Sequence, residues 1–504
     1  MTRGGSKQEY LAVSLAAGAL LVRQLYLVSR IPPFDGFYTP AHDLAVSLAL
    51  SGSGSVSGAE GLVPREAIYA TYPALHIFSV MLGSITGMSV SFLWNWLGFL
   101  LDLLLFLAIF LAGRRLGRSN YGGAIALSYL LLSDRLLDNG IHTMRETFAI
   151  PLSMLSLYVV LMMVDLPFHS FDIVLITLSM VLSFSHPVTA IATASFMLLM
   201  IVAGRIAGRA GVRIPALAAT ITVVTWYLYQ SPRYLGYYAV MLRSLIESMY
   251  GPHGEYIVPP YPMSSSVGQL LFYSLKWVSL FLGGLAIVFT FIHLRSRRKT
   301  DPQVGTWWYL TIGVAAFLAY TAVRAGGWRF SGLANAADLF NRLESYVFMT
   351  WAPVLAFVIN RTRLIRYRSF AFLFLLVSGT LIAFTSPGTS GMLNIEAEVS
   401  DHFPLLSTMW DFCGSRCNGA ILTPDDGVYS STYIEATYLR PVIGLRTSNT
   451  SLTDLGGSAI FVYVDFEVEA YPPNLSLNSS KWSTVYSEGH GRLLSLVPAN
   501  DTEL

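Results

Sequence analysis

The sequence is dominated by long apolar runs that contain few charged residues. A helix needs about 20 apolar residues to cross a lipid bilayer, with a range of roughly 17–25. Of the 504 residues, 54% are hydrophobic and only 12% are charged, whereas soluble domains average about 25% charged residues. The runs therefore predict an all-α polytopic membrane protein with about eleven spans, at residues 10–30, 91–113, 121–134, 147–164, 172–185, 188–204, 214–230, 268–293, 305–323, 345–360 and 369–385.

The positions of lysine and arginine predict the orientation of these spans, because basic residues favour cytoplasmic loops. The run 73–89 is short, rich in small residues and carries His76 near its start. If it dips into the outer face without crossing, all the basic clusters lie inside; if it crosses, they lie outside. These clusters are at residues 114–118, 205–213, 295–299 and 361–368. We therefore predict a multi-pass protein of the plasma membrane with its N-terminus in the cytoplasm and its C-terminal part outside the cell.

The chain is expected to divide into a membrane domain, residues 1–385, and a small extracellular α/β domain, residues 386–504. The membrane domain includes a first outer loop at 31–90. In the tail, residues 458–470 alternate between apolar and polar side chains as a strand does, and residues 484–497 predict two strands about a Gly-containing turn.

Two further features of the tail fit an external location. Cys413 and Cys417 could close a small disulfide loop in an oxidising compartment, and a metal site is less favoured because His402 is the only other obvious ligand nearby. The tail also contains four Asn-x-Ser/Thr sequons, although Ser, Thr and Asn are common there; they begin at Asn449, Asn474, Asn478 and Asn500.

With this orientation, the ionisable side chains gather in the outer loops. The inner loops hold mostly arginine, as the topology requires, whereas the outer loops mix Asp, Glu, His and Arg. Ionisable groups near the bilayer are costly and mark function. Arginine binds phosphate through two parallel hydrogen bonds, and a carboxylate could act as a general base or hold a divalent ion that bridges phosphates. The mixture suits an enzyme that acts on a lipid-linked phosphate, and the absence of a clustered basic face argues against nucleic acid.

Four stretches resemble the GT-C superfamily of membrane glycosyltransferases, which use polyprenyl-phosphate-linked sugars. PPFDGFYTPAHDLAVSLALSG (32–52) is similar to the first outer loop of that superfamily, with an acidic residue after the first helix. SDRLLDNGIHTMRETFAIPLSMLSLYV (133–159) resembles its second acidic loop, which leads into a helix through Arg-Glu. ATYPALHIFSVMLGSITGMS (70–89) and SHPVTAIATASF (185–196) resemble the Tyr-Pro-x-x-His and His-Pro segments of archaeal members.

The resemblance implies acidic site residues in the first two outer loops. Asp35 is the first candidate for the catalytic base or a metal ligand, and Asp43 is its competitor, although Asp43 could merely cap a helix. Asp138 and Glu146 would join Asp35 if a divalent metal, Mg²⁺ or Mn²⁺, is used. The alternative for Glu146 is a helix start, where the helix macrodipole favours Glu.

The resemblance also implies basic groups for the phosphate of the donor. The candidates are Arg145, His186, Arg329 and Arg342. His186 could instead be an interfacial residue at a helix start, and arginines commonly flank membrane spans. The implied partners are the polyprenyl-phosphate-linked sugar, membrane lipid and a glycan or protein acceptor.

The sequence also departs from known GT-C patterns. The Trp-Trp-Asp-Tyr-Gly signature of oligosaccharyltransferases is absent, and the nearest string is MWDFCG at 409–414. Gly36 follows Asp35, so the Asp-Glu pair of protein mannosyltransferases is absent too. These departures favour a monosaccharide transferase. The alternatives are a lipid or polysaccharide transporter or flippase, and a non-catalytic envelope scaffold.

Overall fold

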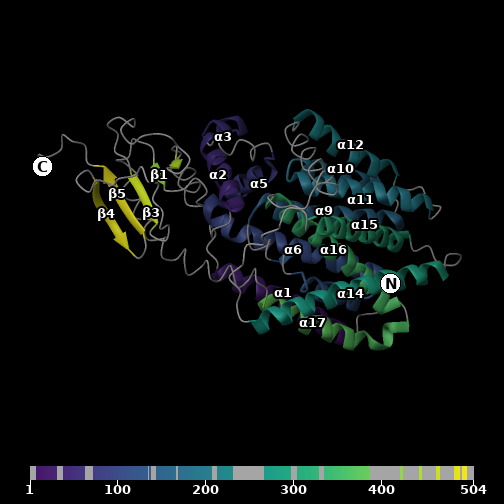
Figure 1. The fold of residues 1–504 in the computed structure, drawn as a ribbon. Coiled ribbons are helices and arrows are strands. Elements are labelled where there is room, and N and C mark those ends of the chain that lie inside the picture. Colours follow the sequence, from purple (N-terminus) through teal and green to yellow (C-terminus); the bar gives the residue numbers. More distant parts are fainter. Residues whose placement is uncertain are drawn as a thin grey trace, which may run out of the picture. The chain divides into compact units, whose positions relative to one another are not determined.

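The structure is a computed structural model in which helices make up most of the described part of the chain (Figure 1). The described residues are 7–30, 38–62, 72–133, 136–137, 143–165, 169–206, 213–230, 266–296, 304–327, 334–361 and 363–385, together with five strands between 421 and 496. Asp35, Asp138, Arg329, Cys413 and Cys417 lie outside these residues.

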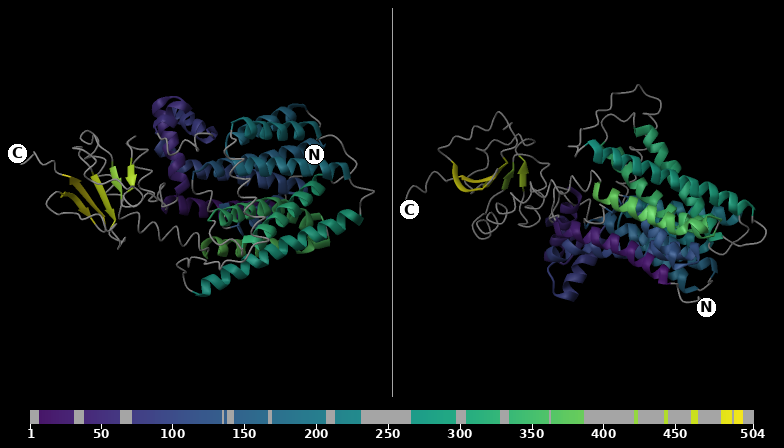
Figure 2. Two further views of the ribbon diagram at one scale, coloured as in Figure 1. Left: turned by 45° about the horizontal axis from the view of Figure 1, so that its top comes forward. Right: turned by 90° about the horizontal axis from the view of Figure 1, so that it is seen from below.

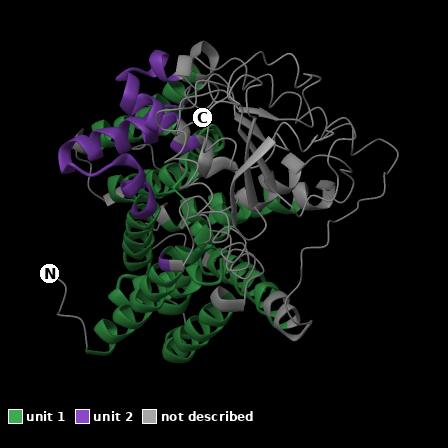
Figure 3. Ribbon diagram, turned by 90° about the vertical axis from the view of Figure 1, so that its left-hand side faces the viewer, with its two compact units in different colours: residues 1–28, 97–391 green, residues 29–96, 392–504 purple. Residues whose placement is uncertain are grey.

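The chain forms two compact units, which are coloured separately in Figure 3. Unit 1 comprises residues 1–28 and 97–391, and unit 2 comprises residues 29–96 and 392–504.

Unit 1 is a bundle of helices whose long members run side by side in the views of Figures 1 and 2. Every predicted span coincides with a helix. In chain order these are α1 (Lys7–Arg30), α6 (Val90–Gly117, which begins in unit 2), α7 (Asn120–Leu130), α9 (Arg145–Asp165), α10 (His169–Ser183), α11 (Pro187–Ile206), α12 (Arg213–Gln230), α14 (Ser266–Ser296), α15 (Val304–Gly327), α16 (Ala334–Arg361) and α17 (Arg368–Thr385), the last preceded by the short 3₁₀ helix η2 (Arg363–Tyr367).

Among the described residues, six helices are long and apolar enough to cross a membrane, which makes this a multi-pass membrane protein. They contain the segments Lys7–Ser29, Val90–Gly117, Arg145–Met163, Ser274–Arg295, Leu343–Arg361 and Leu364–Ile382. Helix α7 has 11 residues and rises about 16 Å, roughly half of the hydrocarbon core. It is shorter than the predicted span 121–134, so the count of eleven crossings and their direction stay predictions.

Helix α16 lies at the centre of unit 1, where it packs against α7, α14 and α15. In its apolar segment, Leu343–Arg361, 94% of the most apolar stretch is buried. Trp351 fills the space left by two glycines, since a Cβ on Gly283 of α14 would lie 1.9 Å from the indole and one on Gly313 of α15 would lie 2.8 Å from it. The indole N–H of Trp351 donates to the carbonyl of Gly313 at 3.0 Å. Small residues let membrane helices approach closely, and here they place α14 and α15 against one tryptophan.

In unit 2, residues 38–86 form a small helical group. Helix α2 (Tyr38–Ser53) packs against α3 (Val56–Leu62) and α5 (Ala74–Thr86). Helix α5 has 13 residues, about 20 Å of helix, which agrees with the interpretation that 73–89 does not cross. It ends at Gly87, whose φ of 72° and N–H bond to the Gly83 carbonyl form a left-handed cap.

The tail contains a five-stranded mixed sheet in the order β2-β1-β3-β5-β4. The strands are β1 (Ile421–Thr423), β2 (Val442–Gly444), β3 (Phe461–Asp465), β4 (Trp482–Glu488) and β5 (Gly491–Leu496). β1 pairs in parallel with β2 and β3, whereas β5 pairs in antiparallel fashion with β3 and β4. The predicted strand at 458–470 and the predicted hairpin at 484–497 are both present, which confirms the sequence pattern there.

Candidate functional site

The first acidic candidate that the structure describes is Asp43, which lies inside α2 and is fully buried. It is the sixth residue of a helix that begins at Tyr38, so the expectation that Asp43 might cap the helix is wrong. The reason is Pro40, which fits the first turn because no intrahelical N–H bond is needed there. The helix therefore begins at Tyr38, before Asp43.

Asp43 belongs to a closed polar cluster with Ser47 and His76. Ser47 follows Asp43 by one helical turn, and His76 comes from the first turn of α5. The Asp43 Oδ1 and His76 Nε2 atoms are 3.8 Å apart, and both side chains have no exposed area. The Ser47 hydroxyl donates to the Asp43 carbonyl oxygen at 3.0 Å and lies 2.9 Å from His76 Nδ1.

The protons of this cluster are constrained by its geometry. Because Ser47 gives its hydroxyl proton to a carbonyl, its oxygen is left to accept from Nδ1–H of His76. A neutral imidazole with that proton would turn an unprotonated Nε2 towards the Asp43 carboxylate. At 3.8 Å the two atoms are too far apart for a hydrogen bond, but the Asp43 carboxylate would stabilise a protonated imidazole by charge attraction. Such a group can give or take a proton.

The second acidic segment leads into α9, where Arg145 and Glu146 occupy the first turn and are each 5% exposed. Glu146 thus lies where the macrodipole favours a carboxylate, as the helix-start interpretation expected. Helix α9 is tied to α11 by a 2.7 Å hydrogen bond between the Ser153 and Thr193 hydroxyls.

His186 caps α11. Its Nδ1 lies 2.9 Å from the Thr189 hydroxyl and accepts from the Thr189 N–H at 3.4 Å. The imidazole is 6% exposed. This confirms the interpretation of His186 as a residue at a helix start. A phosphate bound by this ring would have to meet Nε2, because the cap occupies Nδ1.

The two remaining candidates for phosphate binding are Arg329 and Arg342. Arg329 lies outside the described residues. Arg342 lies in α16, but its side chain is outside the described part of the structure. The structure instead supplies a cation that the sequence analysis missed. Lys276 of α14 lies 2.9 Å from Glu344 of α16, with 20% of the lysine side chain and 2% of the glutamate exposed. A signal was present, because Lys276 is the one charged residue of the apolar run 266–292.

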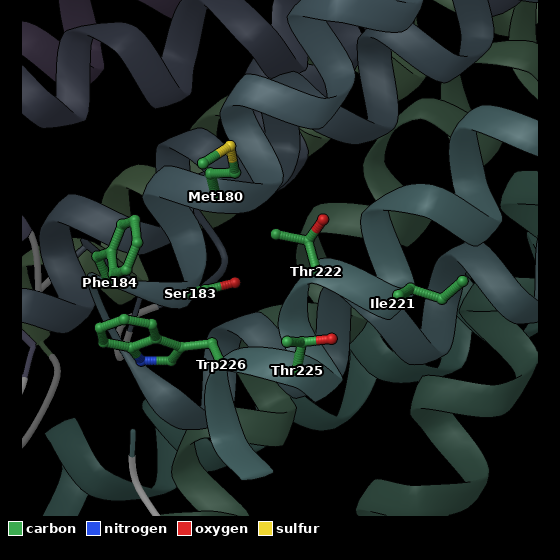
Figure 4. Close-up of a pocket in the computed structure, with 7 residues that line it drawn as sticks. All are labelled: Met180, Ser183, Phe184, Ile221, Thr222, Thr225 and Trp226. Carbon is green, nitrogen blue, oxygen red and sulfur yellow. The ribbon is translucent and has the colours of Figure 1, made fainter. Parts of the chain in front are cut away.

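A groove lies between α10 and α12, as the close-up in Figure 4 shows. Its volume is about 380 Å³. The wall is mainly apolar. At one end the rings of Phe184 and Trp226 pack edge to face, with their centroids 4.2 Å apart. Hydroxyls of Ser183, Thr222 and Thr225 supply the polar part of the lining.

No group of three His, Cys, Asp or Glu side chains that could hold a metal occurs among the described residues. Of the three predicted metal ligands only Glu146 is described, so the proposed Mg²⁺ or Mn²⁺ site stays a prediction.

The sequence matches no family model and no curated protein, but solved structures share its fold. Two crystal structures of ArnT from Cupriavidus metallidurans align with 97% of this chain at 12% identity. The apo structure gives a TM-score of 0.53 over 97% of its own chain, and the structure bound to undecaprenyl phosphate gives 0.54 over 98%. At this identity the likeness concerns the fold alone. It confirms the prediction of a helical polytopic fold, which this chain shares with ArnT.

Proposed function

We propose that this protein is a membrane glycosyltransferase that moves a sugar from a polyprenyl-phosphate-linked donor to a lipid-, protein- or polymer-bound acceptor at the outer membrane face. The observation that carries the proposal is the likeness of fold to ArnT along nearly the whole of both chains, including a structure bound to undecaprenyl phosphate. The chain itself holds polar groups that such a reaction needs, in both compact units.

The donor phosphate would meet the cations at one end of the helices of unit 1. Arg145 and His186 stand at the starts of α9 and α11, and Lys276 lies in the first half of α14; the positive-inside pattern assigns these parts of the helices to the outer side. Lys276 is held by Glu344 but keeps 20% of its side chain exposed. A partly dehydrated ammonium group at this depth attracts phosphate more strongly than one in water, because the local dielectric constant is lower.

The hydrocarbon part of the donor would use the apolar groove between α10 and α12. The exposed Met180 and Ile221 side chains line it, and its far end is formed by Phe184, two residues before His186. An isoprenoid chain in this groove would bring its phosphate towards the start of α11.

The acid–base group would come from the first outer segment. Asp35 and Asp43 compete for this role. The pairing of Asp43 with His76 in a closed cluster gives it a means of exchanging a proton, which a general base requires. Its complete burial means that substrate would have to displace a neighbouring group to reach it, and this weighs towards Asp35 as the residue in direct contact with the acceptor.

The test is transfer of radiolabelled sugar from a pool of polyprenyl-phosphate sugars by the purified full-length protein in lipid nanodiscs. Wild type is compared with Asp35→Asn, Asp43→Asn and Lys276→Met, and with Lys299→Met as a control in a basic cluster that is predicted to be cytoplasmic. We expect Asp35→Asn to lower kcat by about 10²–10⁴-fold and Lys276→Met to raise the donor KM. Absence of transfer by wild type with every donor and membrane acceptor extract would contradict the proposal. A loss in Asp43→Asn alone would move the base from Asp35 to Asp43.

A further inference from the structure

Three polar side chains of unit 1 meet inside two apolar spans. Arg23 and Gln24 of α1 and Asp102 of α6 are 1%, 1% and 2% exposed, and both helices are apolar enough to cross a membrane. Polar groups at this depth are rare unless they have a task. The proposed function does not use them.

Gln24 is the centre of this network, and each of its contacts agrees with one orientation of its amide. Its Nε2 donates to Asp102 Oδ2 and, at 2.9 Å, to the carbonyl oxygen of Leu137. Its Oε1 accepts from Arg23 Nη1 at 2.9 Å. A flipped amide would set its oxygen against two acceptors and its NH₂ against a guanidinium, which only donates. The site therefore requires a side chain with two donors and an acceptor at this length, which glutamine supplies.

The contact with Leu137 links the network to the chain between α7 and α9. Leu137 has no exposed area and lies seven residues after the end of α7. A second tie follows six residues later, where the Thr143 hydroxyl accepts from the Gly98 N–H at 2.7 Å. Gly98 and Asp102 are one turn apart on α6 and thus share a face. Without a side chain at Gly98, Thr143 can reach the backbone of α6.

Both ties lie just before Arg145 and Glu146, which begin α9. The same face of α6 thus binds Thr143 directly and Leu137 through Gln24. The chain that leads into α9 is therefore anchored at two residues, Leu137 and Thr143. Each bond lies where water is excluded, and a hydrogen bond lost there would leave a buried carbonyl or N–H group without its partner.

We propose that Gln24 and Thr143 are positioning residues that set the place of Arg145 and Glu146, with Arg23 and Asp102 fixing the Gln24 amide. The catalytic consequence rests on the proposed function, while the structural part stands without it. This arrangement suits a site that must bind phosphate in one geometry, because misplacement of a catalytic group by about 1 Å can lower the rate by as much as 10²-fold.

The test compares hydrogen–deuterium exchange and sugar transfer for four variants of the full-length protein in nanodiscs. Gln24→Met keeps the length of the side chain and removes its donors and acceptor. Thr143→Val keeps the shape and removes the acceptor, whereas Thr143→Ser keeps the hydroxyl. Thr380→Val is the matched control, because the Thr380 hydroxyl of α17 donates to the carbonyl of Leu376 in its own helix at 2.7 Å.

We expect deuterium uptake in peptides covering 133–137 and 143–150 to rise at least about tenfold in rate, the effect of a lost bond of about 1.4 kcal/mol, in Gln24→Met and Thr143→Val. The donor KM should rise about tenfold with them, and Thr143→Ser and Thr380→Val should behave as wild type. Unchanged uptake in both variants would overturn the proposal, as would a rise spread over all helices, which indicates general destabilisation. A selective rise in uptake with an unchanged KM would remove Arg145 from the donor site. If wild type transfers no sugar, the proposed function fails while the exchange rates still decide whether the two residues hold this segment.

Discussion

Two pairs of ionisable side chains in this protein differ in how far water can reach them. Asp43 and His76, in the helical group of residues 38–86, are both fully buried and stand 3.8 Å apart. Lys276 and Glu344, in the bundle of unit 1, are 2.9 Å apart, and the lysine keeps 20% of its side chain exposed. The first pair is closed on all sides, whereas the second has one partner that can meet a ligand.

This difference separates a proton-holding group from a ligand-binding one. A fully buried pair is strongly coupled, because neither charge can be hydrated when the other is removed. A partly exposed cation can contact a phosphate with its exposed part while it stays paired with its buried carboxylate. The closed pair should therefore control stability and protonation, and the open pair should control affinity for an anion.

The largest expected effect is the removal of the Asp43 carboxylate. Asp43→Ala removes the acidic group that faces the His76 ring in a fully buried cluster, so the free energy of unfolding should fall by about 3–5 kcal/mol. Denaturant titration in mixed micelles measures this. The double variant Asp43→Leu/His76→Leu, which leaves no charge behind, should be more stable than Asp43→Ala. A loss below about 1 kcal/mol for Asp43→Ala would show that the cluster is hydrated like a surface pair and would abolish the contrast.

The second prediction is an asymmetry within the open pair. Lys276→Met removes the ammonium group that faces the buried Glu344 carboxylate, which is 2% exposed, and should lower the free energy of unfolding by about 3 kcal/mol. Glu344→Gln leaves a lysine that can reach water, so it should cost about 1 kcal/mol. The same micelle titration gives both values. Equal losses would mean that Lys276 is as enclosed as its partner and is a poor candidate for phosphate binding.

Much of the fold was predictable, because the apolar runs mark helices directly. Every predicted span coincides with a helix, and the strands of the tail follow their alternating pattern. Helix ends were predicted less well. Pro40 allowed α2 to begin at Tyr38, and α7 stopped at Leu130, short of the predicted end at residue 134.

The site was harder to predict, because pairing across helices leaves no local pattern. The sequence predicted Arg145, Glu146 and His186, which stand at helix starts, and Asp43, which lies inside α2, as candidates. The partnership of Lys276 with Glu344 joins residues 68 positions apart, and that of Gln24 with Asp102 joins residues 78 apart. A lone charged or amide side chain in an apolar span is the one signal that could have drawn attention to them.

The third prediction concerns what holds the open pair together. A Cβ on Gly283 of α14 would lie 1.9 Å from the Trp351 ring, whereas Gly284 has nothing within 4 Å. Gly283→Ala should force α14 away from α16 and lower the free energy of unfolding by about 2 kcal/mol. Gly284→Ala is the control and should be neutral or stabilising by up to about 1 kcal/mol. In transfer assays the Gly283 variant should also raise the donor KM, and an unchanged KM with this loss of stability would separate the Lys276–Glu344 pair from donor binding.

The smallest expected effect sharpens the description of the closed pair. Ser47→Ala removes a hydroxyl that donates to the Asp43 carbonyl at 3.0 Å and meets His76 Nδ1 at 2.9 Å, and should lower the free energy of unfolding by about 1 kcal/mol. Ser79→Ala is the matched control, because the Ser79 hydroxyl donates to the backbone carbonyl of His76 at 2.9 Å and leaves the imidazole ring untouched. If the hydroxyl of Ser47 accepts from the ring, the NMR signals of the labelled His76 imidazole should shift in Ser47→Ala and stay in place in Ser79→Ala. A double-mutant cycle with His76→Phe isolates the contact: an interaction energy near zero would show that Ser47 supports only the helix backbone, and that Asp43 and His76 form the closed pair without it.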